Sequence, residues 1–343
     1  MTRVQIPAAA LILWIRMPRS SHGGARWVQG RPEELSDFSV NLNPLGPPGF
    51  VEEILEEAMK LKVYRYYPDQ YEAAKERVAE IYGIDPGYIA LTNGASEALY
   101  YIPKGEVPEP NFGELPRSRS YYAMETSNEF LYYLRGDTVI TSNPVNPTGS
   151  EVSTREILAH LESGKRLFLD ESFVDLSLAR SHIKLIEDFP NLMVIGSFTK
   201  SLSVPGLRIG FVAGKGVRSF EKRMPPWRVN SLAYFLLSNL SVKKYRAHMD
   251  KTRDYLREAI SGLRSLDRLK VYKTRAPFVL LETPVDSEAM KRRLLKEGYL
   301  IRSCKDFKGL RRGHIRISLR PGFDLLVNKL REVIEETGEV KGS

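Results

Sequence analysis

The stretch SFTKSLSVPGLRIG, residues 197–210, directly follows the apolar run LMVIGS (192–197). It contains Lys200, with Ser197 three positions before it and Arg208 eight positions after it. Taken alone, this lysine is one of 51 basic residues, and a solvated loop charge is its ordinary interpretation. Lys200 comes just after a predicted strand. Whether it is a solvated loop charge or a functional residue is therefore judged from the polar residues found elsewhere in the chain.

Three further polar segments accompany Lys200. Asp170 ends the strand-like run RLFLD thirty residues before Lys200, and Asn146 lies twenty-four residues before Asp170 in NPVNPTG. The tripeptide GAS, residues 94–96, opens a predicted helix. Each segment has a purely structural interpretation, as a loop cap, a turn or a helix cap. Their order and spacing, taken together, form a specific combination.

Helical and strand patterns alternate around these segments. Amphipathic periodicity predicts helices over 51–62 and 71–83, and Ser153 begins a capping box that opens another helix. Short β-rich runs predict strands at 88–99 (followed there by a turn and a helix start), 137–142, 166–172, 192–197 and 208–214. Strands separated by helices imply a mainly parallel sheet covered on both faces, whose ligands bind beyond the carboxyl ends of the strands.

The pattern changes near residue 230. A long helical stretch over 231–263 leads into a predicted hairpin within 271–282, followed by a helix, two strands and a C-terminal helix at 290–299, 299–304, 314–319 and 323–336. The predicted fold is therefore α/β, with a large domain of mainly parallel sheet flanked by helices and a smaller α+β domain. We expect 51–230 to form the large domain, 231–343 the interdomain helix and small C-terminal domain, and 17–50 an N-terminal segment of the small domain.

Residues 1–16 differ from the rest of the chain. The apolar run IPAAALILWI (6–15) is similar to a secretory signal core, but it is too short to span a bilayer and no small-residue cleavage site follows. We interpret residues 1–16 as a doubtful extension, either because the start codon is assigned ahead of Met17 or because the addition is non-functional. A targeting signal is the alternative. The remaining sequence predicts a cytoplasmic protein without a membrane segment.

Composition narrows the functional classes. The chain has 343 residues, 42% hydrophobic and 27% charged, which favours about two globular domains and excludes a disordered or collagen-like protein. A single cysteine excludes a disulfide framework or a cysteine metal cluster, and the five histidines show no ligand spacing, so we expect no metal. The formal charge of +9 favours anionic ligands, but the basic residues are scattered and no nucleic-acid-binding motif accompanies them.

The combination of Lys200, Asp170, Asn146 and the GAS segment resembles fold-type I pyridoxal-phosphate enzymes of the class I/II aminotransferase superfamily. The resemblance extends from about residue 22 to the C-terminus and implies pyridoxal 5'-phosphate as cofactor. Lys200 would bind the cofactor's aldehyde covalently and transfer protons, and Asp170 would keep the pyridinium nitrogen protonated. Asn146 would donate a hydrogen bond to the ring hydroxyl oxygen.

The other implied cofactor contacts surround the phosphate and the ring. The phosphate would be held at a helix N-terminus, where backbone N–H groups and the helix dipole favour anions. By this resemblance the phosphate contacts are Gly94, Ala95, Ser96, Ser197 and Arg208, with Tyr67 reaching the phosphate of a neighbouring subunit in a homodimer. Phe112, in EPNFGEL, would stack on the ring.

Two positions depart from the family pattern. Phe173 stands where many aminotransferases have a tyrosine that touches the ring hydroxyl, so that hydrogen bond is absent here. The segment from Pro103 to Phe112 is short, and Leu115 stands where relatives often have an aromatic residue. The ring-stacking role of Phe112 is therefore the site assignment most in need of a structural test.

Several segments are similar to the threonine-phosphate decarboxylase branch, which is related to histidinol-phosphate aminotransferases. These segments are HGG (22–24), DFSVNLNPLGPP (37–48), LDESFVDLS (169–177) and MPPWRVNSLA (224–233). Arg302 in YLIRSC and Arg316 in HIRISL are the matching candidates for binding a phosphorylated amino acid, since a planar guanidinium suits phosphate and carboxylate. A solvated arginine at a strand edge is the alternative for each. Asn43 and His22 are further substrate candidates, and Arg320 is a weaker one.

The resemblance therefore implies a homodimeric enzyme acting on a small phosphorylated amino acid. Decarboxylation of L-threonine O-3-phosphate, in cobalamin synthesis, is the leading interpretation. Transamination of histidinol phosphate or a related amino acid is the second, and a catalytically silent cofactor-binding protein is the third. Both reactions break a bond to the substrate α-carbon, and the orientation of the substrate selects between them.

Overall fold

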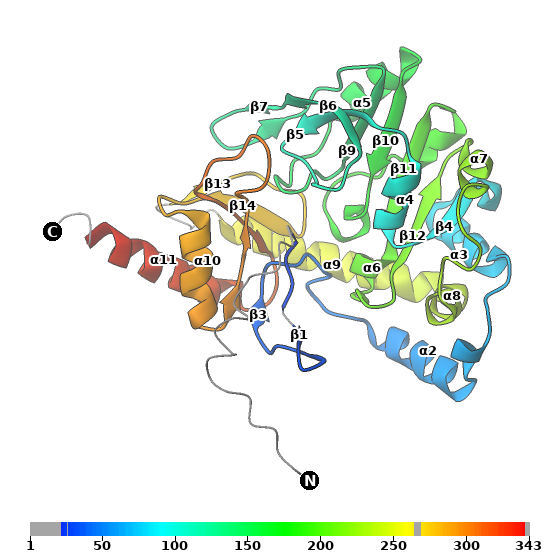
Figure 1. Ribbon diagram of the computed structural model, residues 1–343, viewed down its shortest axis with the longest axis horizontal. Coiled ribbons are helices and arrows are strands. Elements are labelled where there is room, and N and C mark those ends of the chain that lie inside the picture. Colours follow the sequence, from blue (N-terminus) through cyan, green and yellow to red (C-terminus); the bar gives the residue numbers. More distant parts are fainter. Residues whose placement is uncertain (1–21, 26, 264–268, 340–343) are drawn as a thin grey trace, which may run out of the picture.

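The computed structural model describes residues 22–25, 27–263 and 269–339, with side chains described up to residue 336. Its largest element is a seven-stranded sheet in the order β4-β12-β11-β10-β9-β5-β6 (Figure 1). The strands are β4 (Ile89–Asn93), β12 (Ile209–Ala213), β11 (Leu192–Ser197), β10 (Arg166–Asp170), β9 (Thr138–Ser142), β5 (Gly105–Glu109) and β6 (Arg117–Tyr122). Only β12 within this sheet runs antiparallel to its neighbours, so the predicted mainly parallel sheet is confirmed.

Helices pack around this sheet. The predicted helices at 51–62 and 71–83 are α2 (Gly49–Lys60) and α3 (Glu72–Tyr82), and Gly83 caps the second in the left-handed conformation. The others in this part are α4 (Ala95–Tyr101), α5 (Thr154–Glu162), α6 (Phe198–Ser201), α7 (Val217–Glu221) and α8 (Ser231–Ser238), with 3₁₀ turns at Val63–Arg65, Pro86–Tyr88, Val174–Leu176 and Ile183–Glu187. Only half of the predicted capping box forms, because Glu156 Oε1 accepts from the backbone N–H of Leu134.

The C-terminal part contains a second, antiparallel sheet in the order β13-β14-β17-β16. Its strands are β13 (Lys270–Val271), β14 (Phe278–Glu282), β17 (His314–Ser318) and β16 (Arg302–Ser303), and its helices are α10 (Ser287–Lys296) and α11 (Phe323–Glu339). The predicted hairpin is confirmed by the antiparallel pairing of β13 with β14. These elements bury an apolar core separate from that of the large sheet.

The N-terminal segment packs with this C-terminal part. Strand β3 (Ser36–Asp37) pairs in parallel with β15 (Tyr299–Leu300), and Phe38 is buried in the C-terminal core. Two short hairpins complete the described strands: β1 (Trp27–Val28) with β2 (Arg31–Pro32), and β7 (Met124–Glu125) with β8 (Phe130–Leu131). The domain limits themselves stay a prediction, and the interpretation of residues 1–16 lies outside the described residues.

Two predicted elements are wrong in their extent. The helical stretch over 231–263 breaks between α8 and α9 (Val242–Gly262), because Ser241 caps the new helix by accepting from the backbone N–H of Lys244. The run YLIRSC divides between β15 and β16, which pair with different partners. Helix α9 runs along the middle of the molecule between the two sheets (Figure 1). None of the described helices is long and apolar enough to cross a bilayer.

Strands β5 and β6 are absent from the sequence prediction. They were not predicted because the proline in GEVPE and the arginines that alternate with serines in RSRSYY depart from the usual composition of a strand. They are parallel neighbours, yet only residues 110–116 connect them. Parallel strands normally need a crossover of about a dozen residues or more, most often a helix. Residues 110–116 therefore lead from the end of β5 to the start of β6 without forming a helix.

Gly210 on β12 provides a test of the packing between this strand and the start of α4. A Cβ there would lie 2.5 Å from the backbone of Gly94 and Ala95, so Gly210→Ala forces the strand and helix apart. We expect the free energy of unfolding to fall by about 1–3 kcal/mol in urea titrations. Gly206→Ala is the control, because its Cβ meets nothing within 4 Å. Equal unfolding curves for the two variants would contradict this packing.

Candidate functional site

A cavity of about 510 Å³ lies beyond the carboxyl ends of β5, β9, β10 and β11, where it also meets residues of β16 and β17. Nine of the predicted site residues line it: His22, Ser96, Phe112, Asn146, Phe173, Lys200, Arg208, Arg302 and Arg316. Residues far apart in the sequence thus meet at the edge of the sheet where the strand order predicted a ligand site.

Lys200 lies on α6, the short helix that directly follows β11. Its Nζ is 3.9 Å from the centroid of the Phe173 ring. Burial in the cavity wall lowers the pKa of this amine to about 8; the nearby Asp170 carboxylate opposes the shift, and the guanidinium groups of Arg316 and Arg208 add to it. A larger fraction of Lys200 is therefore neutral, and so nucleophilic, near neutral pH than of an ordinary lysine side chain.

Asp170 ends β10 and is buried. Its Oδ1 accepts from the backbone N–H of Ser172 at 2.9 Å and from the Ser172 hydroxyl at 2.5 Å. Asp170 lies outside the cavity lining, but these bonds hold its carboxylate close enough to Lys200 to affect the pKa of the amine. The arrangement suits a fixed anion that stabilises a cationic ligand group.

An anion-binding corner forms where α4 begins. Gly94 has φ +74°, and a Cβ at this position would lie 2.7 Å from Nη2 of Arg208, so the guanidinium lies directly against the glycine. Arg208 itself has φ +56°, a conformation unfavourable for a residue with a side chain. The Ser96 hydroxyl is 3.4 Å from the same Nη2. The left-handed backbone conformations of Gly94 and Arg208 thus place the Arg208 guanidinium beside the Ser96 hydroxyl at the start of α4.

Three of the predicted phosphate contacts lie outside the cavity lining. Gly94, Ala95 and Ser197 do not belong to the cavity lining, whereas Thr199 does. The Ser197 hydroxyl lies 3.5 Å from the backbone oxygen of Ile209, and the Thr199 hydroxyl accepts from the Ile209 N–H at 2.8 Å. Thr199 was not predicted, because a threonine two positions after a predicted strand carries no sequence signal that distinguishes it from a turn residue.

Arg302 and Arg316 are paired directly across β16 and β17. Arg302 forms an ion pair with Asp306 at 2.7 Å. Arg316 is buried, and it donates to Asn146 Oδ1 and, at 2.8 Å, to the backbone oxygen of Ser39. Burial lowers the pKa of Arg316 to about 10. Both arginines line the same cavity.

The described hydrogen-bond acceptors of Arg316 are neutral. With the amide of Asn41 oriented so that its oxygen faces the guanidinium, that oxygen accepts from Arg316 Nε at 3.3 Å and Nη1 at 3.2 Å. A buried cation surrounded by neutral acceptors is poorly compensated, because amides and carbonyls replace lost hydration only in part. Such a position favours binding of an anion from solution.

The side chains of two predicted substrate contacts, Asn43 and Arg320, lie outside the cavity lining. Asn43 lies outside the cavity lining, and its Nδ2 donates to the backbone oxygen of Ser201 and to the Thr252 hydroxyl, each at 3.0 Å. Its neighbour Asn41 lines the cavity instead. The spacing of NLN gave no basis for choosing between the asparagines. The weaker candidate Arg320 is also outside the cavity lining, with Nη1 bonded to the backbone oxygen of Asp37.

His22 and Phe112 lie together at one side of the cavity. Their ring centroids are 6.1 Å apart, and His22 Nε2 is 3.2 Å from a carboxylate oxygen of Glu114. Tyr67, in contrast, lies in a separate surface groove, where its ring stacks on Trp227 at 4.4 Å and is 76% exposed. Tyr67 therefore lies outside the lining of the cavity that holds Lys200.

Several charged residues of the cavity were missed. Glu109, Arg117, Asp306 and Lys308 line it, although their sequence neighbourhoods carry no motif. Glu109 and Arg117 belong to the strands that the sequence concealed, and Asp306 and Lys308 lie in the turn after β16. Charge alone is a weak signal in a chain with 51 basic and 42 acidic residues.

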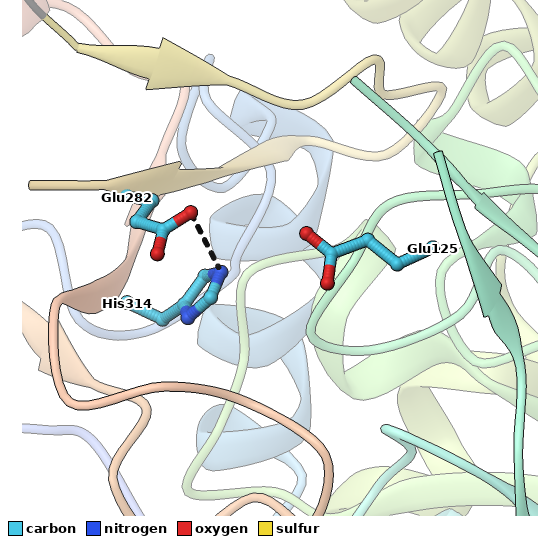
Figure 2. A group of neighbouring side chains, drawn as sticks. All are labelled: Glu125, Glu282 and His314. Atoms are coloured by element: carbon cyan, nitrogen blue, oxygen red, sulfur yellow. Dashed lines mark ion pairs between the residues drawn. The ribbon is translucent and has the colours of Figure 1, made fainter. Parts of the chain in front are cut away.

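A second polar cluster, outside this cavity, joins the β7–β8 hairpin to the C-terminal sheet. Glu125 from β7 faces Glu282 of β14 and His314 of β17 (Figure 2). The three could hold a metal ion by position, but Arg311 donates to both carboxylates and Lys270 donates to Glu125. These bonds hold the pKa of both carboxyl groups below the usual range. The bonds from Arg311 and Lys270 therefore make this cluster an ion-pair network.

The donor set of the cavity fits pyridoxal 5'-phosphate. Lys200 offers an amine for the aldehyde, Asp170 a fixed carboxylate for the ring nitrogen, and the Gly94–Arg208 corner a positive cradle that a Cβ would fill. The cavity wall also carries an amide at Asn146 and aromatic rings at Phe112 and Phe173.

Comparisons with known proteins agree with this fit. Residues 133–332 match the model of the family Aminotransferase class I and II. The threonine-phosphate decarboxylase of Salmonella typhimurium is 29% identical over 92% of this chain and 97% of its own. The histidinol-phosphate aminotransferase of Pyrococcus furiosus is 27% identical over 84% of this chain and 89% of its own.

A solved structure extends the likeness to the fold. The L-threonine-O-3-phosphate decarboxylase of Porphyromonas gingivalis matches with a TM-score of 0.73 and 26% identity, covering 88% of this chain and 100% of that one. The family match spans more than half of the chain, and the fold and the donor set agree with it. The chain therefore belongs to the class I and II aminotransferases, a family of pyridoxal-phosphate-dependent enzymes that includes decarboxylases as well as aminotransferases.

Proposed function

We propose that this enzyme decarboxylates L-threonine O-3-phosphate. The observation that carries the proposal is the buried Arg316, held beside Arg302 with neutral hydrogen-bond acceptors around it. A substrate that carries both a phosphate and a carboxylate supplies an anion for Arg316, whose described hydrogen-bond acceptors are neutral. The relatives named for threonine phosphate support the same substrate class.

Each residue of the cofactor site has a role in this proposal. Lys200 binds the aldehyde, Asp170 the ring nitrogen and Asn146 the ring hydroxyl oxygen. Ser96, Ser197, Arg208 and the backbone at Gly94 and Ala95 hold the phosphate, and Phe112 and Phe173 contact the ring. When bound, pyridoxal phosphate withdraws the electron pair that is left when a bond to the substrate α-carbon breaks.

The residues of the chain determine which bond breaks. Arg302 and Arg316 bind the substrate phosphate, with Asn41 and His22 at the same end of the cavity. Anchoring the phosphate there leaves the carboxylate free to stand perpendicular to the cofactor ring, in the direction from which cleavage is favoured. Lys200, with a pKa of about 8, can then hold or return a proton at Nζ.

Transamination of histidinol phosphate is the second candidate. The same arginines can hold its phosphate, and the similarity to the Pyrococcus furiosus enzyme favours it. In that reaction the Cα–H bond takes the perpendicular position and Lys200 accepts the proton. The two reactions use the same groups and differ in the orientation of the substrate.

We also propose that the enzyme acts in the cytoplasm as a homodimer. Tyr64, Tyr66, Tyr67 and Trp227 are each more than half exposed, and they surround one surface groove. Exposed aromatic residues in such a cluster are typical of a protein interface. In the dimer, Tyr67 reaches the cofactor phosphate of the neighbouring subunit.

Product analysis tests the reaction. With L-threonine O-3-phosphate we expect carbon dioxide and aminopropanol phosphate. With histidinol phosphate and 2-oxoglutarate we expect little glutamate. Arg302→Gln should raise KM for the phosphorylated substrate by roughly 10- to 100-fold, the range of a charged hydrogen bond, and leave KM for plain threonine nearly unchanged. Arg320→Gln, outside the cavity lining, is the matched control. Rapid glutamate formation without carbon dioxide would contradict decarboxylation.

The pH dependence of Lys200 tests the electrostatics of the site. Because a lowered pKa means that the proton leaves at lower pH, the neutral amine should appear as pH rises through about 8. Trace labelling of the cofactor-free protein with acetic anhydride, read by peptide mass spectrometry, measures this midpoint. A Lys200 midpoint at the value of a free lysine side chain, about 10.4, would show that the amine is solvated.

Sedimentation tests the subunit arrangement. We expect the wild-type enzyme to sediment as a dimer and Trp227→Glu to sediment as a monomer, because the charge would be buried in the interface. Tyr67→Phe should remain dimeric and bind the cofactor about fivefold more weakly, the effect of one lost hydrogen bond. A fully active monomer at assay concentration would exclude the cross-subunit role of Tyr67.

A further inference from the structure

The connection between β5 and β6 forms part of the cavity wall. Its residues Asn111, Phe112 and Gly113 line the cavity, although residues 110–116 contain no helix. A crossover helix would satisfy its own backbone carbonyl groups through internal hydrogen bonds. In this irregular connection those carbonyl groups need other partners.

Arg117, the first residue of β6, supplies those partners. Its Nη2 donates to the backbone oxygen of Phe112 at 2.6 Å, and its Nη1 donates to those of Gly113 and Leu115 at 2.7 and 2.6 Å. Its Nε donates to Glu109 Oε1 at 2.6 Å. A single guanidinium thus holds three carbonyl groups of the connection and the residue that ends β5.

Glu109 fixes the same segment from the other side. Its side chain is only 1% exposed, and its Oε2 accepts from the backbone N–H of Asn111 at 2.9 Å. The Asn111 side chain in turn accepts from the backbone N–H of Phe112 at 2.9 Å. Both backbone polar groups of Phe112 are therefore bonded to this network, so the direction of its ring depends on it.

Arg117 is poorly suited to binding substrate, although it lines the cavity. A guanidinium has five N–H groups, and the contacts to Glu109, Phe112, Gly113 and Leu115 engage four of them. The buried Glu109 carboxylate also neutralises its charge. Arg302 and Arg316, on the opposite strands, have the neutral or exposed partners that an incoming anion can replace.

We propose that Arg117, paired with Glu109, is a positioning residue that fixes the ring of Phe112 against the cofactor in place of a crossover helix. The inference rests on the role given to Phe112 in the proposed function, and it holds for decarboxylation and transamination alike. Arg117 acts through the backbone of Phe112 and needs no contact with the cofactor itself.

Arg117→Lys is the first test. Lysine keeps a positive charge beside Glu109, but a single ammonium group cannot span the carbonyl groups that the guanidinium fork reaches. We expect pyridoxal phosphate to bind about tenfold more weakly in fluorescence titrations, and the visible circular dichroism of the bound cofactor to lose most of its amplitude. The thermal midpoint of the cofactor-free protein should change little. Arg119→Lys, at an exposed position on the same strand, should change none of these quantities.

A double-mutant cycle with Phe112→Leu tests whether Arg117 acts through the ring. If it does, Phe112→Leu weakens cofactor binding by itself, and adding Arg117→Lys has little further effect. Additive losses, or an Arg117→Lys protein whose cofactor affinity and dichroism equal those of Arg119→Lys, would overturn the inference. An unchanged affinity in Phe112→Leu alone would overturn it together with the ring-contacting role of Phe112.

A third variant covers the case in which Arg117→Lys fails to fold. Glu109→Gln combined with Arg117→Gln removes both charges without leaving either one buried alone. The inference predicts a folded protein with the same loss of dichroism, and retention of the wild-type signal would overturn it. None of these titrations depends on which product forms, so the choice between decarboxylation and transamination can fail while the inference stands.

Discussion

The site depends on the parallel register of β9, β10 and β11. Asp170 is level with Ser142 on one neighbour and with Ile195 on the other, so all three strands end at the same edge of the sheet. The segments that follow β9 and β11 carry Asn146 and Lys200 into one cavity, and Asp170, the last residue of β10, is close enough to Lys200 to affect its pKa. A shift of one residue in either pairing would turn the side chains at the strand ends to the opposite face.

Positive charge is concentrated at this edge beyond what folding requires. Lys200, Arg208 and Arg316 lie close enough that each guanidinium lowers the pKa of the lysine, and burial lowers the pKa of Arg316 itself. Ion pairs compensate some cations, as Glu109 does for Arg117 and Asp306 for Arg302. The cations that remain favour bound anions, because each anion relieves a desolvation cost already present.

The cavity is also a junction between the two sheets. Arg316 of β17 donates to Asn146, which follows β9. Before β17, Arg311 donates to Glu125 of β7 and to Glu282 of β14, two carboxylates that face each other in Figure 2. The position of the C-terminal sheet therefore sets how far Arg302 and Arg316 lie from the cavity residues of the large sheet, and the two arginines are held level with each other because they are paired across adjacent strands.

The sequence by itself determined the alternating α/β order, most helix and strand positions, and the family to which Lys200, Asp170, Asn146 and Arg208 point. These features follow from local periodicity and from residues that lie close to strand ends. The exchange of Asn43 for Asn41, the break at Ser241 and the helix-free connection held by Arg117 were decided only by the tertiary structure. Their physical reason is shared: each depends on which hydrogen-bond partners the folded chain brings near, and neither spacing nor composition records those partners.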